Sequence, residues 1–273
     1  MPIAALSDGS VASLQTRQGE SISLTGLAGV PLIQPGDELA SIIINTIGLS
    51  ATRVSEGDIF VIAQKIVSKA ENRYVDLCTI EPSSKAIELA AAVQKDPRLV
   101  EVILAESSEV VRFAPGVLIV AHRNGYVMAN AGVDASNLET DKKGGERVLL
   151  LPLDCDASCA NLRERLESHF KCRIGVIISD SVGRAWRNGS VGLALGVAGP
   201  PALWDRIGED DLYGRKLQVT VIGYADQIAA AAALVMGEGA EGIPVVKIGN
   251  LVWEPSGIDG RQLLREKKQD LFR

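Results

Sequence analysis

Two short polar stretches, each directly after an apolar run, carry the side chains best suited to chemistry. They are Asn130–Asn137 (NAGVDASN) and Ser179–Gly189 (SDSVGRAWRNG). Each is expected to form a tight turn at the end of a strand and to present one carboxylate, Asp134 or Asp180. Hard divalent cations prefer oxygen ligands, commonly carboxylates together with substrate phosphates. The two stretches therefore indicate a metal and phosphate site, typical of a phosphoryl-transfer enzyme.

The neighbours of these carboxylates strengthen this interpretation. Ser181 adds a hydroxyl beside Asp180, and Asn137 adds an amide that can donate to phosphate or ribose. Guanidinium groups such as those of Arg184 and Arg187 suit clamping of a phosphate or a carboxylate, although surface arginines also form ordinary ion pairs. Taken singly, each aspartate is equally explained as a turn residue that satisfies backbone donors. Together they predict four catalytic candidates: Asp134, Asp180, Arg184 and Arg187.

A basic group follows the buried strand expected at Asp58–Ala63. It consists of Lys65, Ser68, Lys69 and Arg73. Cations at a strand end can neutralise a triphosphate, but on an exposed helix Lys65 and Lys69 would share a solvated face. Both interpretations stay open.

The glycines at 189, 192, 196 and 199 indicate close approach of the backbone to a neighbour, or bulges.

The segment from Gly237 to Gly242 matches G-x-G-x-x-G, but it follows a helix and precedes a strand, so it is not a dinucleotide-binding fingerprint. A left-handed helix cap at Gly237 explains one glycine, and a ligand loop that includes Gly239 explains the others. Glu238 offers a further carboxylate.

The chain has no phosphate-binding P-loop motif, and Cys155, Cys159, His169 and Cys172 do not have the spacing of a structural zinc site.

Composition limits the function further. The 273 residues carry a net charge of −6, which argues against nucleic-acid binding, and no apolar stretch is long enough to span a bilayer. The first residues lack the basic region of a secretion signal, and four cysteines in a chain of this length indicate reduced thiols. We therefore expect a cytoplasmic enzyme that acts on small molecules.

Hydrophobic periodicity predicts an α+β fold in which strands occur both in runs and alternating with helices. Helices are expected at 37–49, with Asp37 as the N-cap, and at 84–94, 97–105, 156–170 and 225–236. Strands are expected at 58–63, 110–113, 117–122, 126–129, 148–151, 174–178, 192–197, 217–223 and 245–248. The charged tail at 260–272 is expected to form an exposed helix.

These motifs, in this order, resemble the coenzyme F420-0:L-glutamate ligases, also called γ-glutamyl ligases. The resemblance covers about Gly29 to Trp253. Its motifs are Gly57–Ile59, Gln64–Lys69, Asp96–Arg98, Asn130–Asn137, Leu151–Asp154, Ser179–Arg184, Trp186–Gly189, Asp211–Arg215 and Met236–Glu238.

The resemblance implies a GTP-dependent ligase with two divalent ions, Mg²⁺ or Mn²⁺, that joins L-glutamate to the lactyl carboxylate of F420-0. Further γ-linked glutamates can follow. GTP would phosphorylate the acceptor carboxylate to an acyl phosphate, which the glutamate amine then attacks. The implied metal ligands are Asp134, Asp180, Ser181 and Glu238. The implied nucleotide contacts are Val30, Pro31, Leu32, Ile33, Ser68, Lys69, Arg73, Asn137, Gly237 and Gly239.

The resemblance also implies two interleaved subdomains with mixed and antiparallel sheets, assembled as an intertwined homodimer. We expect residues 1–257 to form the catalytic unit and 258–273 the charged tail. The chain departs from the family pattern at Asn72 for a glycine, Cys155 for a proline and Gln227 for a glutamate. Asparagine tolerates left-handed backbone, so the turn at Asn72 can persist. The alternatives are a related ligase or kinase with a different acceptor, or a non-catalytic nucleotide- or deazaflavin-binding protein.

Overall fold

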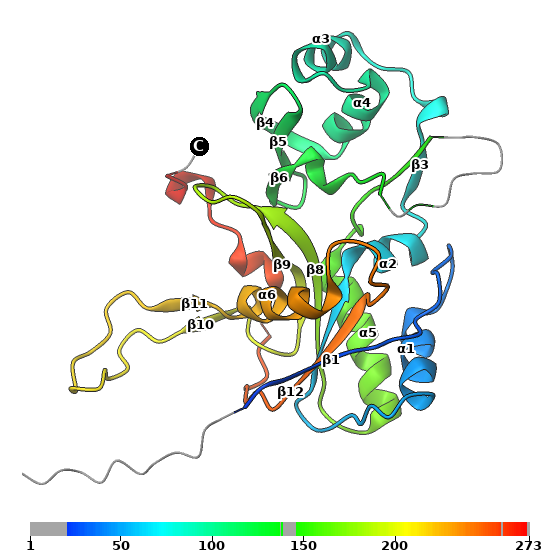
Figure 1. Cartoon of the computed structure of the whole chain (residues 1–273). Coiled ribbons are helices and arrows are strands. Elements are labelled where there is room, and N and C mark those ends of the chain that lie inside the picture. Colours follow the sequence, from blue (N-terminus) through cyan, green and yellow to red (C-terminus); the bar gives the residue numbers. More distant parts are fainter. Residues whose placement is uncertain (1–20, 137, 139–145, 258, 272–273) are drawn as a thin grey trace, which may run out of the picture.

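The computed structural model describes residues 21–136, 138, 146–257 and 259–271. It has two parts, a larger one built on a five-stranded sheet and a smaller one inserted between two of its strands (Figure 1). Three hydrophobic cores hold them together, two on the opposite faces of the main sheet and one inside the smaller part. The fold class is α+β, as the sequence predicts.

The main sheet is mixed, with strand order β1-β12-β2-β8-β9. Its strands are β1 (Ser23–Gly26), β12 (Val245–Gly249), β2 (Ile59–Ala63), β8 (Gly175–Gly183) and β9 (Ser190–Ala198). Only β2 and β8 are parallel to each other, and the remaining pairs are antiparallel. The two parallel strands lie next to each other and are covered on both faces, which explains why β2 and residues 175–178 of β8 are continuously apolar rather than alternating.

Helices cover both faces of this sheet. Helices α1 (Leu39–Gly48) and α5 (Cys155–Phe170) pack on one face, and α6 (Tyr224–Met236) packs on the other. The short helix α2 (Gln64–Ala70) continues directly from β2. The N-cap of α1 is Glu38, whose carboxylate accepts from the backbone N of Ser41. The predicted cap Asp37 is therefore wrong, because its carboxylate accepts from the N–H of Gln34 in the preceding turn instead.

The smaller part is built from local elements. It contains α3 (Ser84–Val93), α4 (Pro97–Ala105) and a three-stranded antiparallel sheet of β4 (Ser107–Ala114), β5 (Val117–His122) and β6 (Val127–Ala129). Strands β3 (Tyr74–Asp76) and β7 (Arg147–Leu149) pair where the chain enters and leaves this part. Two 3-10 turns, η1 (Leu77–Thr79) and η2 (Asn130–Gly132), complete it.

The strand bounds differ most from the prediction in β8 and β11. Strand β8 runs on to Gly183, because β9 pairs with it along Asp180↔Leu193 and Ser181↔Gly192. The predicted turn at Asp180 is therefore wrong, and Asp180 lies inside a strand. Strand β11 (Val221–Gly223) is shorter than predicted. It pairs with β10 (Leu203–Asp205) in a two-stranded arm that projects from the main sheet (Figure 1).

The predicted C-terminal helix is wrong over the described residues. The tail forms two 3-10 turns, η3 (Gly260–Leu263) and η4 (Lys267–Gln269). The six residues between Leu264 and Leu271 are all charged or polar, so the tail lacks the continuous apolar stripe that stabilises a surface helix. The tail is instead held by contacts with the body, among them a hydrogen bond of 2.8 Å from the Gly260 N–H to Asp156.

The four cysteines are free, and Cys155 and Cys159 are buried. Asn72 adopts a φ of 55°, so asparagine does support the left-handed turn at this position. Among the described residues, no helix combines the length and the apolar character needed to cross a membrane.

Candidate active site

A cleft of about 800 Å³ lies where the main sheet meets the smaller part. Most predicted site residues line it, although they come from five separate segments of the chain. The lining includes Val30–Ile33, residues 63–66 and 69 around α2, residues 128–130, 132–134 and 136, the end of β8 at 179–183, and residues 236–240 after α6. The two carboxylates of the opening motifs thus face one cavity, despite their separation in the sequence.

Asp134 is held by an ion pair and two hydrogen bonds. Its Oδ2 lies 2.7 Å from Nζ of Lys65 on α2. The backbone N–H of Ser136 donates to Asp134 Oδ1 at 2.6 Å, and the Ser136 hydroxyl donates to Oδ2 at 3.0 Å. Burial opposes ionisation of this carboxyl, but Lys65 and Ser136 outweigh it and lower the pKa of Asp134. Asp134 therefore enters the cleft as a preorganised carboxylate.

The backbone before Asp134 is in an uncommon conformation. Asn130, Ala131 and Gly132 have φ values of 54°, 55° and 69°, three left-handed residues in succession. Only glycine adopts this region without a steric cost, so the turn stores strain at the edge of the cleft. A Cβ at position 132 would also lie 2.7 Å from the side chain of Leu151. This turn directs the following chain, and with it Asp134, toward α2.

Asp180 reaches the same cleft from β8. Burial raises the pKa of this carboxyl to about 6, and the nearby Asp134 adds to the rise. A hydrogen bond from the Ser181 backbone and the positive charge of Lys65 oppose it. Asp180 is thus a carboxylate whose ionisation is disfavoured by its surroundings, which is common at functional sites.

Ser181 and Glu238 form the opposite side of the acidic group. The Ser181 hydroxyl donates to Oε1 of Glu238 at 2.6 Å. Glu238 follows Gly237, whose φ of 72° and ψ of 179° lie in a region that is essentially limited to glycine. Gly237 does cap the end of α6, but the predicted left-handed conformation is wrong, because its ψ is extended. The Glu241 carboxylate folds back to accept from the Gly239 N–H at 2.8 Å, which shapes the loop.

Four predicted site residues do not line the cleft. The Ser68 hydroxyl is buried and donates to Oε1 of Gln64 at 2.9 Å. Arg184 donates to the carbonyl of Gly189 at 3.0 Å within the exposed loop between β8 and β9, which also carries Arg187. The Arg73 guanidinium binds Glu106 and the Leu151 carbonyl. Asn137 lies outside the described residues.

Other cleft residues received no individual role from the sequence. Lys65 was predicted only as one member of a basic group, and Asn130 and Ser136 were predicted only as parts of a motif. The signal available for Lys65 was its position directly after a buried strand. The structure adds its partner, Asp134, which no spacing rule connects to it across the chain.

Arg73 carries a prediction about stability. Its Nη2 lies 3.1 Å from Oε2 of Glu106, and its Nε donates to the Leu151 carbonyl at 2.9 Å, so it joins three segments of the smaller part. Arg73→Ala should lower the free energy of unfolding by about 2 kcal/mol, because the nearest guanidinium left to this largely buried carboxylate is that of Arg123, at 4.0 Å. Urea denaturation measures this change. The exposed Arg112→Ala on β4 is the control and should change stability by less than about 0.5 kcal/mol; an equal loss in both variants would contradict the assignment.

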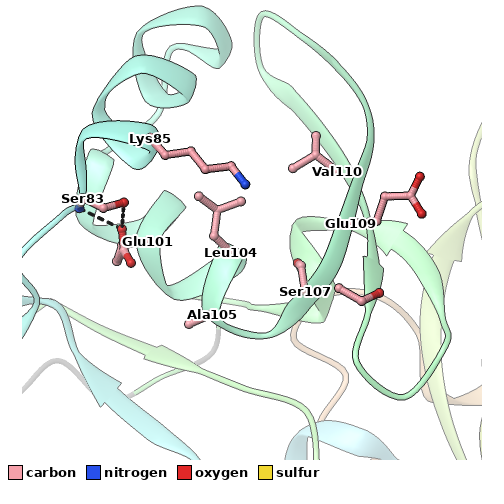
Figure 2. Close-up of a pocket in the computed structure, with 9 residues that line it drawn as sticks. Ser83, Lys85, Glu101, Leu104, Ala105, Ser107, Glu109 and Val110 are labelled. Atoms are coloured by element: carbon pink, nitrogen blue, oxygen red, sulfur yellow. Dashed lines mark hydrogen bonds between the residues drawn. The ribbon is translucent and has the colours of Figure 1, made fainter.

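A second, smaller pocket of about 210 Å³ lies among α3, α4 and β4 (Figure 2). Lys85 extends across it, and Glu101 accepts from the backbone N and the hydroxyl of Ser83 at 2.9 and 2.6 Å (Figure 2). This pocket contains none of the predicted site residues. Its two carboxylates already have partners, Glu101 in Ser83 and Glu109 in Lys267 at 2.6 Å, so we assign the pocket no part in the chemistry of the main cleft.

The fold and the cleft define a class, an α+β protein with a mixed central sheet and an acidic cleft beside an inserted smaller part. The chain belongs to the F420-0:gamma-glutamyl ligase family, whose profile matches residues 29–250. A protein of Methanothermobacter thermautotrophicus named coenzyme F420:L-glutamate ligase is 44% identical over 254 residues, covering 92% of this chain and 99% of the relative. Proteins with the same name are 46% identical in Methanocaldococcus jannaschii, over 81% of this chain and 86% of the relative, and 42% identical in Archaeoglobus fulgidus, over 90% and 94%.

Proposed function

We propose that this protein is a cytoplasmic, GTP- and divalent-metal-dependent ligase that forms an amide between L-glutamate and the lactyl carboxylate of coenzyme F420-0. The name shared by its relatives supports the substrates. The observation that carries the proposal is the convergence of Asp134, Asp180, Ser181 and Glu238 on one cleft. GTP as the nucleotide, and the addition of further γ-linked glutamates, are carried over from the family.

The donor set of the cleft fits the implied metal ions. Among the described residues, no three His, Cys, Asp or Glu side chains form a ready metal cluster. The candidates are three carboxylates and a hydroxyl, and these hard oxygen donors are the ligands that Mg²⁺ and Mn²⁺ favour. Asp180 is also a carboxylate whose surroundings disfavour its charge, so a bound cation would offset that charge. Asp134, Asp180, Ser181 and Glu238 would hold the ions, which would neutralise charge on the nucleotide phosphates.

The chemistry requires an activated carboxylate. A carboxylate is a poor electrophile, so the acceptor is first phosphorylated by GTP to an acyl phosphate, which carries a good leaving group. The glutamate amine then attacks the carbonyl carbon and releases phosphate. The residues of the cleft hold the two substrates in line and exclude water, and such positioning supplies most of the catalysis in phosphoryl transfer. In this proposal Val30–Ile33, Lys69 and the loop at Gly237–Gly239 bind the nucleotide.

We also propose that the active form is a homodimer. The β10–β11 arm extends away from the main sheet (Figure 1). It carries large apolar side chains that are exposed. Leu212 is 98% exposed, Tyr213 84% and Val219 85%. Exposed apolar side chains carried on one projecting element are typical of a protein interface. A second copy of this chain would cover them.

The proposal is tested by incubating the protein with GTP, L-glutamate, F420-0 and Mn²⁺ or Mg²⁺. We expect phosphate release that requires both the acceptor and glutamate, and a product whose mass corresponds to F420-0 plus glutamate. Mass spectrometry also counts any further glutamates. Phosphate release that ignores both acceptor and glutamate would refute the ligase, and dependence on another acceptor would favour a related ligase or kinase.

A further inference from the structure

Lys65 brings an ammonium group among the acidic side chains of the cleft. Its Nζ lies 2.7 Å from Asp134 Oδ2 and donates to the Ser136 hydroxyl at 2.8 Å. Its charge also acts on Asp180. The side chain is 24% exposed, so a ligand in the cleft can reach it. Lys65 therefore faces both carboxylates that the motifs single out.

The sheet register explains this position. Ala63, the last residue of β2, is paired with Ser179 of β8, and these two strands are parallel. Lys65 follows Ala63 by two residues and Asp180 follows Ser179 by one, so both emerge at the same edge of the sheet. Asp134 approaches that edge from the smaller part. Lys65 thus lies at the point where the two parts of the molecule share the cleft.

In the proposed reaction, the ammonium and a divalent ion would compete for Asp134. Lysine is a compact charge on a flexible stem, so its ammonium can move to another anion when its carboxylate partner is taken. The anion available in the same cleft is the terminal phosphoryl group of the nucleotide. A cation at this group stabilises the charge that develops on its oxygens during transfer.

We propose that Lys65 is a catalytic residue: it neutralises Asp134 in the free protein, and its ammonium contacts the transferred phosphoryl group in the reacting complex. This inference rests on the proposed function. In the step concerned, an oxygen of the acceptor carboxylate forms a bond to the γ-phosphorus. The bond from that phosphorus to the bridging oxygen breaks, and GDP leaves with the electron pair. Lys65 keeps its proton throughout.

The alternative is that Lys65 only fastens α2 to the loop of Asp134. The two roles differ in a measurement that does not depend on turnover, the affinity of the nucleotide-free protein for Mn²⁺ alone. If the ammonium occupies the position of a cation, Lys65→Met should bind Mn²⁺ roughly tenfold more tightly than the wild type, since the competing charge is gone. If Lys65 only fastens the loop, its loss disorders Asp134 and weakens Mn²⁺ binding.

The experiment uses the full chain, with Mn²⁺ titrated by electron paramagnetic resonance and amide formation measured separately. For Lys65→Met we expect tighter Mn²⁺ binding, kcat lower by roughly 10²- to 10³-fold and KM for GTP within about threefold of the wild-type value. Lys65→Arg keeps the charge and should keep wild-type Mn²⁺ affinity. Lys85→Met, in the smaller pocket, is the matched control and should change neither quantity.

Mn²⁺ binding by Lys65→Met that is unchanged or weaker, or kcat within about threefold of the wild-type value, would overturn the proposal. If the methionine variant does not fold, Lys65→Gln, which keeps a polar head, replaces it in both measurements with the same expected directions. A wild-type protein that forms no amide would refute the proposed function instead. The comparison of Mn²⁺ affinities would then still test whether Lys65 neutralises the metal position.

Discussion

Asp180→Asn is expected to reduce turnover by at least about 10³-fold while the protein stays folded. The carboxylate lies in the cleft beside Ser181 and within electrostatic reach of Asp134. Asparagine has nearly the same shape but no charge, so it would hold a divalent cation far more weakly. Loss of an electrostatic contact to the reacting group typically costs about 10²- to 10³-fold, and loss of a metal ligand costs more. Amide formation from F420-0 and glutamate measures the effect.

The same variant should not be less stable in the absence of metal. Burial raises the pKa of Asp180 from 3.8 to about 6, so ionisation of this group opposes folding. The wild type is expected to lose this part of its stability as pH rises from about 4 through about 6. Asp180→Asn is neutral throughout, so it should match the wild type at pH 4 and exceed it by up to about 3 kcal/mol at pH 7. Denaturation of the metal-free proteins at both pH values checks the sign.

Glu88→Gln is the matched control for Asp180→Asn. It removes one carboxylate from an exposed face of α3, outside the cleft, and should leave both turnover and stability within experimental error. Near-normal turnover in Asp180→Asn would remove this residue from the active site. If Asp180→Asn is instead less stable than the wild type at pH 7 while the two are equal at pH 4, the charge of Asp180 is stabilised by a partner, and Asp180 is not merely buried.

The sequence predicted the central elements of the fold because buried segments are rich in apolar residues at regular spacing. Strand β2 and residues 175–178 of β8 are apolar without interruption, and α3 and α5 keep a helical period, so each of these stretches was expected close to where it is observed. The polar end of β8 was not expected to be part of a strand. Strands β1, β3 and β10 were not predicted. Each has only three or four residues and forms because a partner strand lies beside it, which no local pattern encodes.

The candidate metal ligands of the cleft were predictable for a different reason. Asp134, Asp180, Ser181 and Glu238 lie in motifs with several polar residues at fixed spacing, and the structure brings them to one cleft. The arginines were harder to assign. A long side chain can reach many partners, and the tertiary structure alone directs Arg73 to Glu106 rather than toward the cleft. The sequence indicates the chemistry of a side chain, but it does not indicate the direction in which the side chain points.

Gly196→Ala is expected to be the most damaging small substitution in the described core. A Cβ on Gly196 would lie 2.4 Å from both the carbonyl carbon and the oxygen of Cys155, and 2.7 Å from its Cβ. The β8–β9 register shifts between Ile178 and Ser179, so that the neighbouring Leu195 faces the α5 side of the sheet as well. The bulge presses the backbone of β9 against the first turn of α5, where only glycine fits.

The clash cannot be relieved by a small movement, because α5 is fixed at this end. The Asp154 side chain caps its first turn, and Asp156 Oδ1 accepts from the N–H groups of Val197 and Gly260 at 2.9 and 2.8 Å. To make room for a methyl group, the helix would have to leave the strand and the tail together. Overpacking costs about 1–3 kcal/mol where side chains can adjust, and a clash with fixed backbone should cost about 3 kcal/mol or more.

Thermal unfolding measures this loss, and we expect Tm to fall by roughly 6–12 °C. Gly48→Ala is the control, since a Cβ there meets nothing within 4 Å at the end of α1. That variant should be neutral or more stable by up to about 1 kcal/mol, because alanine favours the helix. A Tm for Gly196→Ala within 2 °C of the wild-type value would mean that β9 and α5 can separate without cost. The bulge would then not be the element that fixes the helix relative to the sheet.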